Sequence, residues 1–356
     1  MMKKLEYIVT FVTPAFLGNA EQSAQWRTPP FKALLRQWWR VAYAAERRFM
    51  VKLDEMRREE GLLFGHAWLD DDKDEKGNKV AARKSAVRMR LNRWDEGKLK
   101  SWQSLGNMGK VSHPEVKAPV GSDLYLGYGP LNYSGGGTAL KANAAIQAGE
   151  SAKLSLAVPE ASSTLIEQAL WLMDRFGAAG GRSRNGWGSL SLAPAEGTLP
   201  ISCPLRSRPW EQALTLDWPH AIGQDTSGLL IWQTQPFEDW KALMKELATI
   251  KIGLRTKFRF TTGKNAERPE ARHWLSYPVT NHSVKPWGNN ARLPNSLRFK
   301  VRQDKQEPKK LCGVIFHMPC LPPKEFRPDP QSISSVWQQV HDYLDRESTP
   351  VTRIAD

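Results

Sequence analysis

The segment FGAAGGRSRNGWGSLSL, residues 176–192, limits the possible folds most, because it places a glycine-rich turn between a helix pattern and a strand pattern. Apolar residues recur upstream at helical spacing, at Leu165, Ala169, Leu172 and Phe176. A Walker loop runs from strand to helix and ends in Gly-Lys-Ser/Thr, whereas Trp187 follows Gly186 here. The sequence also lacks a G-x-G-x-x-G motif at this turn. This order of elements disfavours mononucleotide and dinucleotide folds.

The residue types in this turn are suited to phosphate. Two arginines flank a serine, an asparagine adds an amide, and adjacent glycines allow a ligand to approach the backbone closely. The residues that we predict to contact RNA here are Gly180, Gly181, Arg182, Ser183, Arg184, Asn185 and Trp187. A sharp surface turn with solvated arginines is the alternative interpretation.

The segment RTPPFKALLRQWWRVAYAAERRF, residues 27–49, predicts an amphipathic helix. One face is apolar and includes Trp38, while Lys32, Arg36 and Arg40 share the opposite face. No Asp or Glu occurs between Pro29 and Ala45 to relieve this charge at helical spacing. We therefore predict that Lys32, Arg36 and Arg40 contact a polyanion, with Arg27 and Trp39 as weaker candidates; a solvated helix face is the alternative.

The charge balance of the whole chain points to the same class of partner. Its 51 Lys and Arg residues against 37 Asp and Glu residues give a net charge of +14. Such an excess suits nucleic acid or an anionic membrane surface, and exposed members of the 15 tryptophans could stack on unpaired bases. A membrane partner is not expected, because the apolar face of the helix at 27–49 is needed for a core.

The chain also gives expectations about its compartment and its domains. The N-terminal residues 1–16 read as a strand rather than a signal peptide, and Cys203, Cys312 and Cys320 lack metal-type spacing. We expect a cytoplasmic protein with reduced thiols, without cofactor or metal. A length of 356 residues favours two domains, residues 1–195 and 211–356, joined by a Pro- and Ser-rich linker at 196–210.

Four segments in order resemble the RAMP superfamily of CRISPR-associated proteins. They are VTFVTPAFLGNA (9–20), RTPPFKALLRQWWR (27–40), GLLFGHAW (61–68) and AGGRSRNGWGSLSL (179–192). The pattern is most similar to the first-numbered RAMP subunit of the Cmr-type, or type III-B, effector complex. Ala15, Asn19 and Asn185 depart from the commoner residues of these motifs.

The resemblance implies an α+β fold of tandem ferredoxin-like (RRM-like) RAMP domains, the second of them divergent. It also implies a non-catalytic subunit that caps the backbone of the complex near the 3′ end of the guide. Its expected partners are CRISPR RNA, complementary target RNA and the other RAMP subunits of the complex.

RAMP relatives also include metal-independent endoribonucleases that process CRISPR RNA, so a nuclease is the alternative function. Such a reaction needs a general acid and base, commonly histidine, beside a cation. The best candidate cluster is Arg272, His273, Lys285 and Arg292, with His282 nearby, but no histidine is close in sequence to either basic motif. A scaffold without RNA contact is a third interpretation, disfavoured by the cationic helix face.

Overall fold

The computed structural model describes residues 1–288 and 290–355 and shows a mixed α+β protein with two four-stranded antiparallel sheets. The first sheet has the strand order β2-β7-β1-β8. Its strands are β1 (Met2–Phe11), β2 (Arg88–Leu91), β7 (Ser151–Pro159) and β8 (Leu190–Pro194). Helix α1 (Thr28–Glu46) follows β1, and α4 (Ser163–Phe176) follows β7. The chain therefore runs strand–helix–strand–strand–helix–strand through this half.

The first core forms because both the strand and the helix patterns are amphipathic. Alternate residues of β1 are buried, namely Leu5, Tyr7, Val9 and Phe11. The apolar face predicted for α1 is buried as well, with Phe31, Leu35 and Trp38 each at 0% exposure. The helix at 27–49 and the polarity of its faces are thus confirmed, although it ends at Glu46.

The second sheet repeats this arrangement, with the strand order β15-β16-β12-β17. Its strands are β12 (Ile231–Thr234), β15 (Leu297–Gln303), β16 (Leu311–His317) and β17 (Val351–Arg353). Helix α6 (Trp240–Thr256) follows β12, and α8 (Pro330–Leu344) follows β16. The order of elements and the order of strands are the same as in the first half, so one topology occurs twice.

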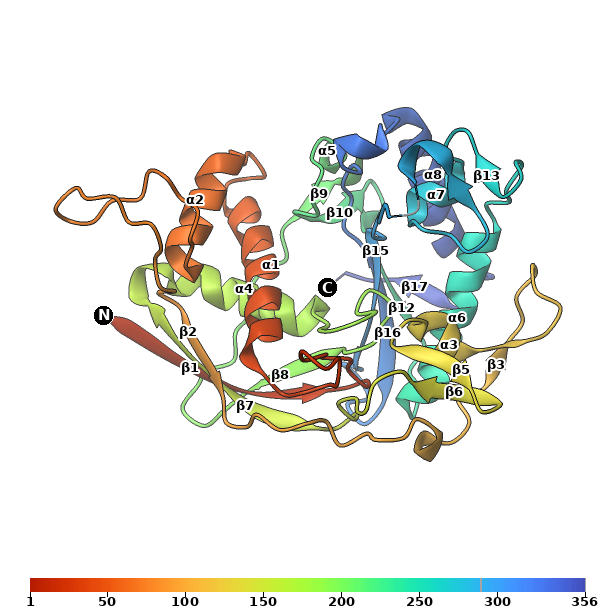
Figure 1. Cartoon of the computed structure of the whole chain (residues 1–356), viewed down its shortest axis with the longest axis horizontal. Helices are drawn as coiled ribbons and strands as arrows, with labels where there is room; N and C mark the ends of the chain where they lie inside the picture. Colours follow the sequence, from red (N-terminus) through yellow and green to blue (C-terminus); the bar gives the residue numbers. More distant parts are fainter. Residues whose placement is uncertain (289, 356) are drawn as a thin grey trace.

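The second sheet is covered on both faces. Leu297, Phe299 and Val301 of β15 pack in one core with α6 and α8. Cys312, Val314 and Phe316 of β16 belong instead to the core of the first half. These β16 residues pair in register with Arg302, Lys300 and Arg298 of β15. Figure 1 shows β15 and β16 standing between α4 on one side and α6 on the other, so cations of β15 are enclosed between the halves.

Shorter elements surround the two sheets. They are α2 (Leu53–Phe64), β3 (Lys110–Val111), β4 (Val120–Gly121), α3 (Ser122–Gly127), β5 (Leu131–Ser134), β6 (Gly137–Leu140), β9 (Ser207–Pro209), α5 (Trp210–Ala213), β10 (Ile222–Asp225), β11 (Gly228–Leu229), β13 (Asn265–Ala266), α7 (Ala271–Leu275) and β14 (Ser283–Val284). Strand β9 lies within the segment expected to be a linker and pairs in parallel with β10. Across the described parts of the chain, we find no helix with the length and apolarity of a membrane span.

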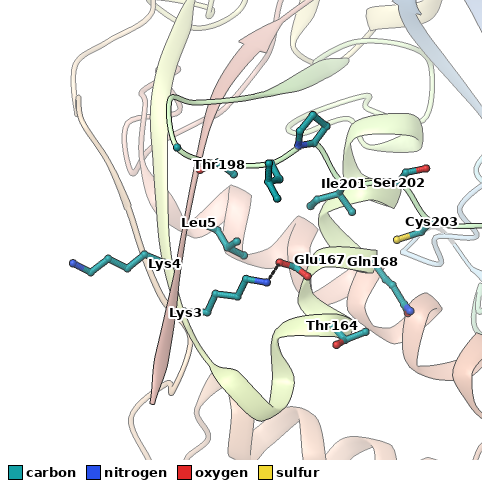
Figure 2. A pocket seen from close by; sticks show the side chains of 13 residues that line it. Lys3, Lys4, Leu5, Thr164, Glu167, Gln168, Thr198, Ile201, Ser202 and Cys203 are labelled. Atoms are coloured by element: carbon teal, nitrogen blue, oxygen red, sulfur yellow. Dashed lines mark ion pairs between the residues drawn. The ribbon is translucent and has the colours of Figure 1, made fainter.

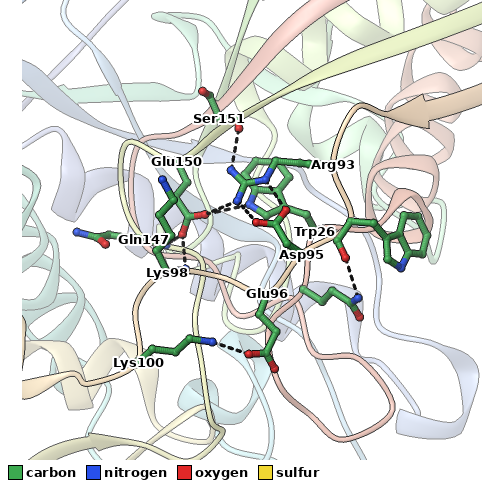
Figure 3. A network of polar contacts seen from close by, with 11 residues as sticks. Trp26, Arg93, Asp95, Glu96, Lys98, Lys100, Gln147, Glu150 and Ser151 are labelled. Atoms are coloured by element: carbon green, nitrogen blue, oxygen red, sulfur yellow. Dashed lines mark hydrogen bonds and ion pairs between the residues drawn. The ribbon is translucent and has the colours of Figure 1, made fainter.

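A buried carboxylate holds the start of α1 in place. The Glu150 side chain accepts hydrogen bonds from the Trp26 indole at 3.1 Å and from the backbone N–H groups of Lys98 and Gln147 at 2.8 and 2.7 Å. Arg93 lies 3.4 Å from the same carboxylate and also bonds Asp95 (Figure 3). Because Trp26 directly precedes α1, this network fixes the helix against the beginning of β7.

Candidate nucleic-acid interface

The glycine-rich loop between α4 and β8 lies where the two halves of the molecule meet. The backbone N–H of Phe299 donates to the Arg184 carbonyl at 3.1 Å, and the N–H of Val301 donates to the Ser189 hydroxyl at 2.9 Å. From α6, the Lys251 ammonium donates to the Asn185 side-chain oxygen. The Asn185 amide in turn donates to the Leu126 carbonyl at 2.7 Å. The loop is therefore held by β15 and α6 of the second half and by α3 of the first.

Gly180 and Gly181 allow the backbone around Phe16, in the segment after β1, to approach the loop closely. Gly180 has a φ of +96°, and a Cβ atom there would lie 2.7 Å from the Phe16 carbonyl oxygen. The Gly181 N–H donates to that same oxygen at 3.0 Å. The backbone after β1 therefore occupies the space that a side chain would need at Gly180, while contact of Gly180 and Gly181 with RNA stays a prediction.

Trp187 and Trp39 are core residues, and the prediction that they contact RNA is wrong. Trp187 is fully buried and packs against Phe16, Trp102 and Trp240, with ring centroids 5.6, 5.4 and 5.9 Å away. Trp39 is 1% exposed and packs against Tyr43. Asn185 is buried too, and both ends of its amide are engaged within the protein. None of these side chains has a free face for a base.

Arg182 and Arg184 are exposed, as is Gly180, and Ser183 between the arginines is half-buried. Arg182 donates to the Tyr128 carbonyl at 2.5 Å. Burial lowers the pKa of both guanidinium groups, and Arg182 is close enough to Lys251 to lower the pKa of that ammonium further. The structure thus brings together the loop arginines and a lysine of α6.

Other cations join this cluster that sequence reasoning missed. They are Lys251 and Arg255 of α6 and Arg298 of β15. Within residues 1–288 and 290–355, no ion pair to a carboxylate is made by Arg182, Arg184, Lys251, Arg255 or Arg298. We call this set the loop cation cluster. Its charge is not neutralised by the protein, so the surface around the loop attracts anions. The alternation of apolar and basic residues in SLRFKV (296–301) was the available signal for Arg298.

The cationic face of α1, by contrast, is paired in part by α2, which supplies one carboxylate for two of its three cations. Glu60 of α2 is 3% exposed, and its carboxylate accepts from Arg36 at 2.8 Å and from Arg40 at 2.9 Å. Lys32 donates to the Phe64 carbonyl at the end of α2, at 2.8 Å. The premise that the charge on this face is unrelieved was wrong, because the acids come from another helix. Lys32, Arg36 and Arg40 serve helix packing here.

Part of the candidate cluster for catalysis lies around one aromatic ring. The Phe260 ring is 4.9 Å from the ring of His273 and 3.6 Å from that of His282, and the Arg272 guanidinium lies 5.2 Å from the same ring. His273 is fully buried, and its Nδ1 accepts the backbone N–H of Glu270 at 3.0 Å, while burial lowers its pKa to about 4. Arg272 is 5% exposed and pairs with Glu115 at 2.6 Å. Lys285 is exposed and bonded to Glu267, and Arg292 is exposed. His273 therefore presents no ring nitrogen to a substrate, and its neighbouring cation is already paired.

Arg27 also has an internal role. Its guanidinium donates to the Gly18 carbonyl in the turn after β1. It begins α1 as the N-cap residue, without a capping hydrogen bond from its side chain. The structure thus ties Arg27 to the turn instead of presenting it freely to RNA.

Two cavities deserve comparison as ligand sites. The larger, about 500 Å³, lies between β1, α4 and residues 197–203 (Figure 2). Its Lys3 is paired with Glu167 at 2.5 Å, and Lys4 is the other charged residue of its lining. The smaller, about 160 Å³, lies between α1 and β15 beside the loop and contains Arg184 and Arg298 without an acidic residue. The smaller cavity is therefore the one that continues the loop cation cluster.

The chain is similar to Cmr1 from Pyrococcus furiosus. The crystal structure of that protein in its apo form matches 98% of this chain and 98% of its own, with a TM-score of 0.46 and 16% identity. No protein-family model matches the chain, and no curated protein does.

Proposed function

We propose that this chain is a non-catalytic RNA-binding subunit of a type III CRISPR effector complex. The observation that carries the proposal is the loop cation cluster, in which arginines and a lysine from both halves surround the glycine-rich loop without carboxylate partners. Phosphate contacts from such groups supply the sequence-independent part of RNA affinity. The RAMP motifs in residues 9–192 supply the class of RNA, namely CRISPR RNA and complementary target RNA.

The two halves are proposed to be tandem ferredoxin-like RAMP domains. The support is the strand–helix–strand–strand–helix–strand order found twice, with the corresponding strand orders β2-β7-β1-β8 and β15-β16-β12-β17. We propose the division into residues 1–195 and 211–356 with 196–210 between them; β8 ends at Pro194, and β12, the first strand of the second sheet, begins at Ile231.

The position in the complex is proposed from the sequence motifs alone. A subunit of the resembled type caps the backbone near the 3′ end of the guide, beside other RAMP subunits, in the cytoplasm. Because the cations that would hold RNA come from both halves, the guide would cross the molecule at the junction between them.

The proposal is tested by RNA binding of an Arg182→Ala, Arg184→Ala double variant. Each of the two substitutions removes one positive charge from the loop cation cluster. The affinity of the protein for single-stranded RNA should therefore fall about 10-fold or more at low salt. The slope of log affinity against log salt should decrease by roughly 1 to 2. Affinity would be measured by fluorescence anisotropy at two salt concentrations.

An Arg88→Ala, Arg90→Ala variant is the matched control, because both arginines are exposed on β2, away from the loop. This control should bind RNA nearly as the unchanged protein does. Equal affinities for the loop variant and the control at both salt concentrations would contradict the proposal. Defined cleavage of a repeat RNA that is lost in a His273→Ala variant would favour the nuclease instead.

A further inference from the structure

The smaller cavity joins the two halves of the molecule through polar and aromatic side chains. Its lining residues from the first half lie on α1, at the end of α4 and in the glycine-rich loop, and those from the second half lie on β15 and β16. The polar groups among them are Gln37, Ser183, Arg184 and Arg298. All four can donate hydrogen bonds, and no carboxylate lines the cavity.

Arg298 is the buried member of this set. Its side chain is 7% exposed, and its Nε has no hydrogen-bond partner among the described residues. Burial, and next to it the charge of Arg184, lowers the pKa of Arg298 to about 9. A buried guanidinium without a counter-charge is unfavourable, and a second one nearby adds repulsion. The unpaired Arg298 beside Arg184 therefore lowers the stability of the folded protein, and an anion bound between the two arginines would remove this penalty.

Among residues 1–288 and 290–355, no carboxylate forms an ion pair with Arg184 or Arg298, and the nearby Asp217 acts on the Cys320 thiol instead. The Arg184 and Arg298 segments are adjacent, since the Arg184 carbonyl accepts from the N–H of Phe299 at 3.1 Å. Cys320 is close to both arginines, but burial raises the pKa of its thiol to about 11 and keeps it neutral. The aromatic part of the lining is formed by Trp38, Phe176 and Phe316, and Phe316 is the cross-strand neighbour of Arg298. Such a lining lowers the local dielectric constant and strengthens any charge pairing inside.

We propose that this cavity binds one phosphate group of an RNA strand, held between Arg184 and Arg298. Guanidinium forks match the oxygens of a phosphate, and the Ser183 hydroxyl and Gln37 amide offer further donors. A cavity of about 160 Å³ is suited to a phosphate group, with the attached nucleosides lying outside it. This assignment rests on the proposed RNA-binding function, but the anion site itself does not.

The first test uses inorganic phosphate and thermal melting of the full chain at constant ionic strength. Phosphate should raise the melting temperature of the unchanged protein, because it binds the folded state alone. An Arg298→Met variant should melt higher than the unchanged protein without phosphate, since it removes a buried unpaired charge. It should bind phosphate at least about 10-fold more weakly in calorimetric titration, as loss of a charge-assisted hydrogen bond predicts.

A second variant distinguishes loss of the phosphate site from misfolding of the Arg298→Met protein. Arg184→Gln changes an exposed side chain of the same cavity and should also weaken phosphate binding. Arg88→Gln, on the distant strand β2, should leave phosphate binding unchanged. Absence of a phosphate effect on the unchanged protein, or an equal effect in all three variants, would overturn the site.

A competition experiment between phosphate and RNA tests separately whether the cavity binds an anion and whether that anion is a phosphate group of RNA. Inorganic phosphate should displace a short single-stranded RNA from the unchanged protein more effectively than chloride does at equal ionic strength. Phosphate binding that depends on Arg298 but does not compete with RNA would overturn the assignment to an RNA phosphate. Phosphate binding in a protein that binds no RNA would overturn both that assignment and the proposed function, while leaving an anion site in the cavity.

Discussion

The ammonium group of Lys300 lies 2.8 Å from the carbonyl oxygen of Gly177, so a strand of the second half closes the end of a helix of the first. The same group donates to the Leu190 carbonyl at 2.7 Å and to the Asp174 carbonyl, and the side chain is fully buried. The last carbonyls of α4 have no partners within the helix and carry its negative dipole end. Lys300 therefore serves as a C-terminal cap supplied from another part of the chain.

Replacing Lys300 by Met should destabilise the protein strongly. Several buried carbonyls would lose their donor, and each unsatisfied group costs about 1–3 kcal/mol, partly offset by the removal of a buried charge. We expect a net loss of about 2–4 kcal/mol in the free energy of unfolding, measured by urea denaturation. Lys309→Met, at an exposed position, should change stability by less than about 0.5 kcal/mol. Equal stability of the two variants would contradict the capping role.

The α1–α2 contact predicts a change in stability without a change in RNA binding. An Arg36→Gln, Arg40→Gln variant leaves the Glu60 carboxylate, which is 3% exposed, without its cations. Because both arginines are partly exposed, the expected loss is about 1–3 kcal/mol. RNA affinity of the folded variant should stay within about 2-fold, since these arginines lie outside the loop cation cluster. A large loss of affinity with unchanged stability would restore this face as an RNA contact.

Trp187 should matter for folding alone. Truncation to Ala removes a fully buried ring and should cost about 3–5 kcal/mol, by thermal or chemical denaturation. Trp94, which is 56% exposed, is the matched control, and its change to Ala should cost little. If Trp187→Ala retained full stability and lost RNA affinity, the buried packing seen here would not describe the protein in solution.

Stability should fall in mild acid because several histidines are buried. Burial lowers the pKa of His220, His273 and His341 to about 4 and that of His317 well below its ordinary value. These rings are neutral in the folded protein and take up protons on unfolding, so stability present above about pH 6.5 is lost as the pH falls toward 4.

The measurement is the urea midpoint at pH 7.5 and pH 5.0. His317 and His341 share a hydrogen bond of 2.9 Å, which restricts how both could be protonated. A His341→Gln variant should therefore lose less stability between these two pH values than the unchanged protein does. A midpoint that is the same at both pH values would contradict the neutral, buried state of these rings.

Local structure could be read from the sequence where periodicity was strong. The helix at 27–49, the helix before the glycine-rich loop and the strand at 296–301 are all present, because amphipathic patterns need only local geometry and a core to face. The loop arginines are exposed, and their predicted contact with RNA stays a prediction. Trp187 and Trp39 were misjudged, because a tryptophan in a basic motif reads the same whether it faces solvent or a core.

The sequence by itself determined the elements, their amphipathic faces and the net positive charge, since these depend on residue type and spacing. Only the tertiary structure decided which cations are neutralised. Glu60 of α2 pairs with Arg36 and Arg40. The Lys300 ammonium donates to carbonyl groups at the end of α4. Among the residues lining the smaller cavity, by contrast, no acidic side chain accompanies Arg184 and Arg298. The physical reason is that charge pairing acts over a few ångströms in space, between residues that are 20 to more than 100 positions apart in the chain.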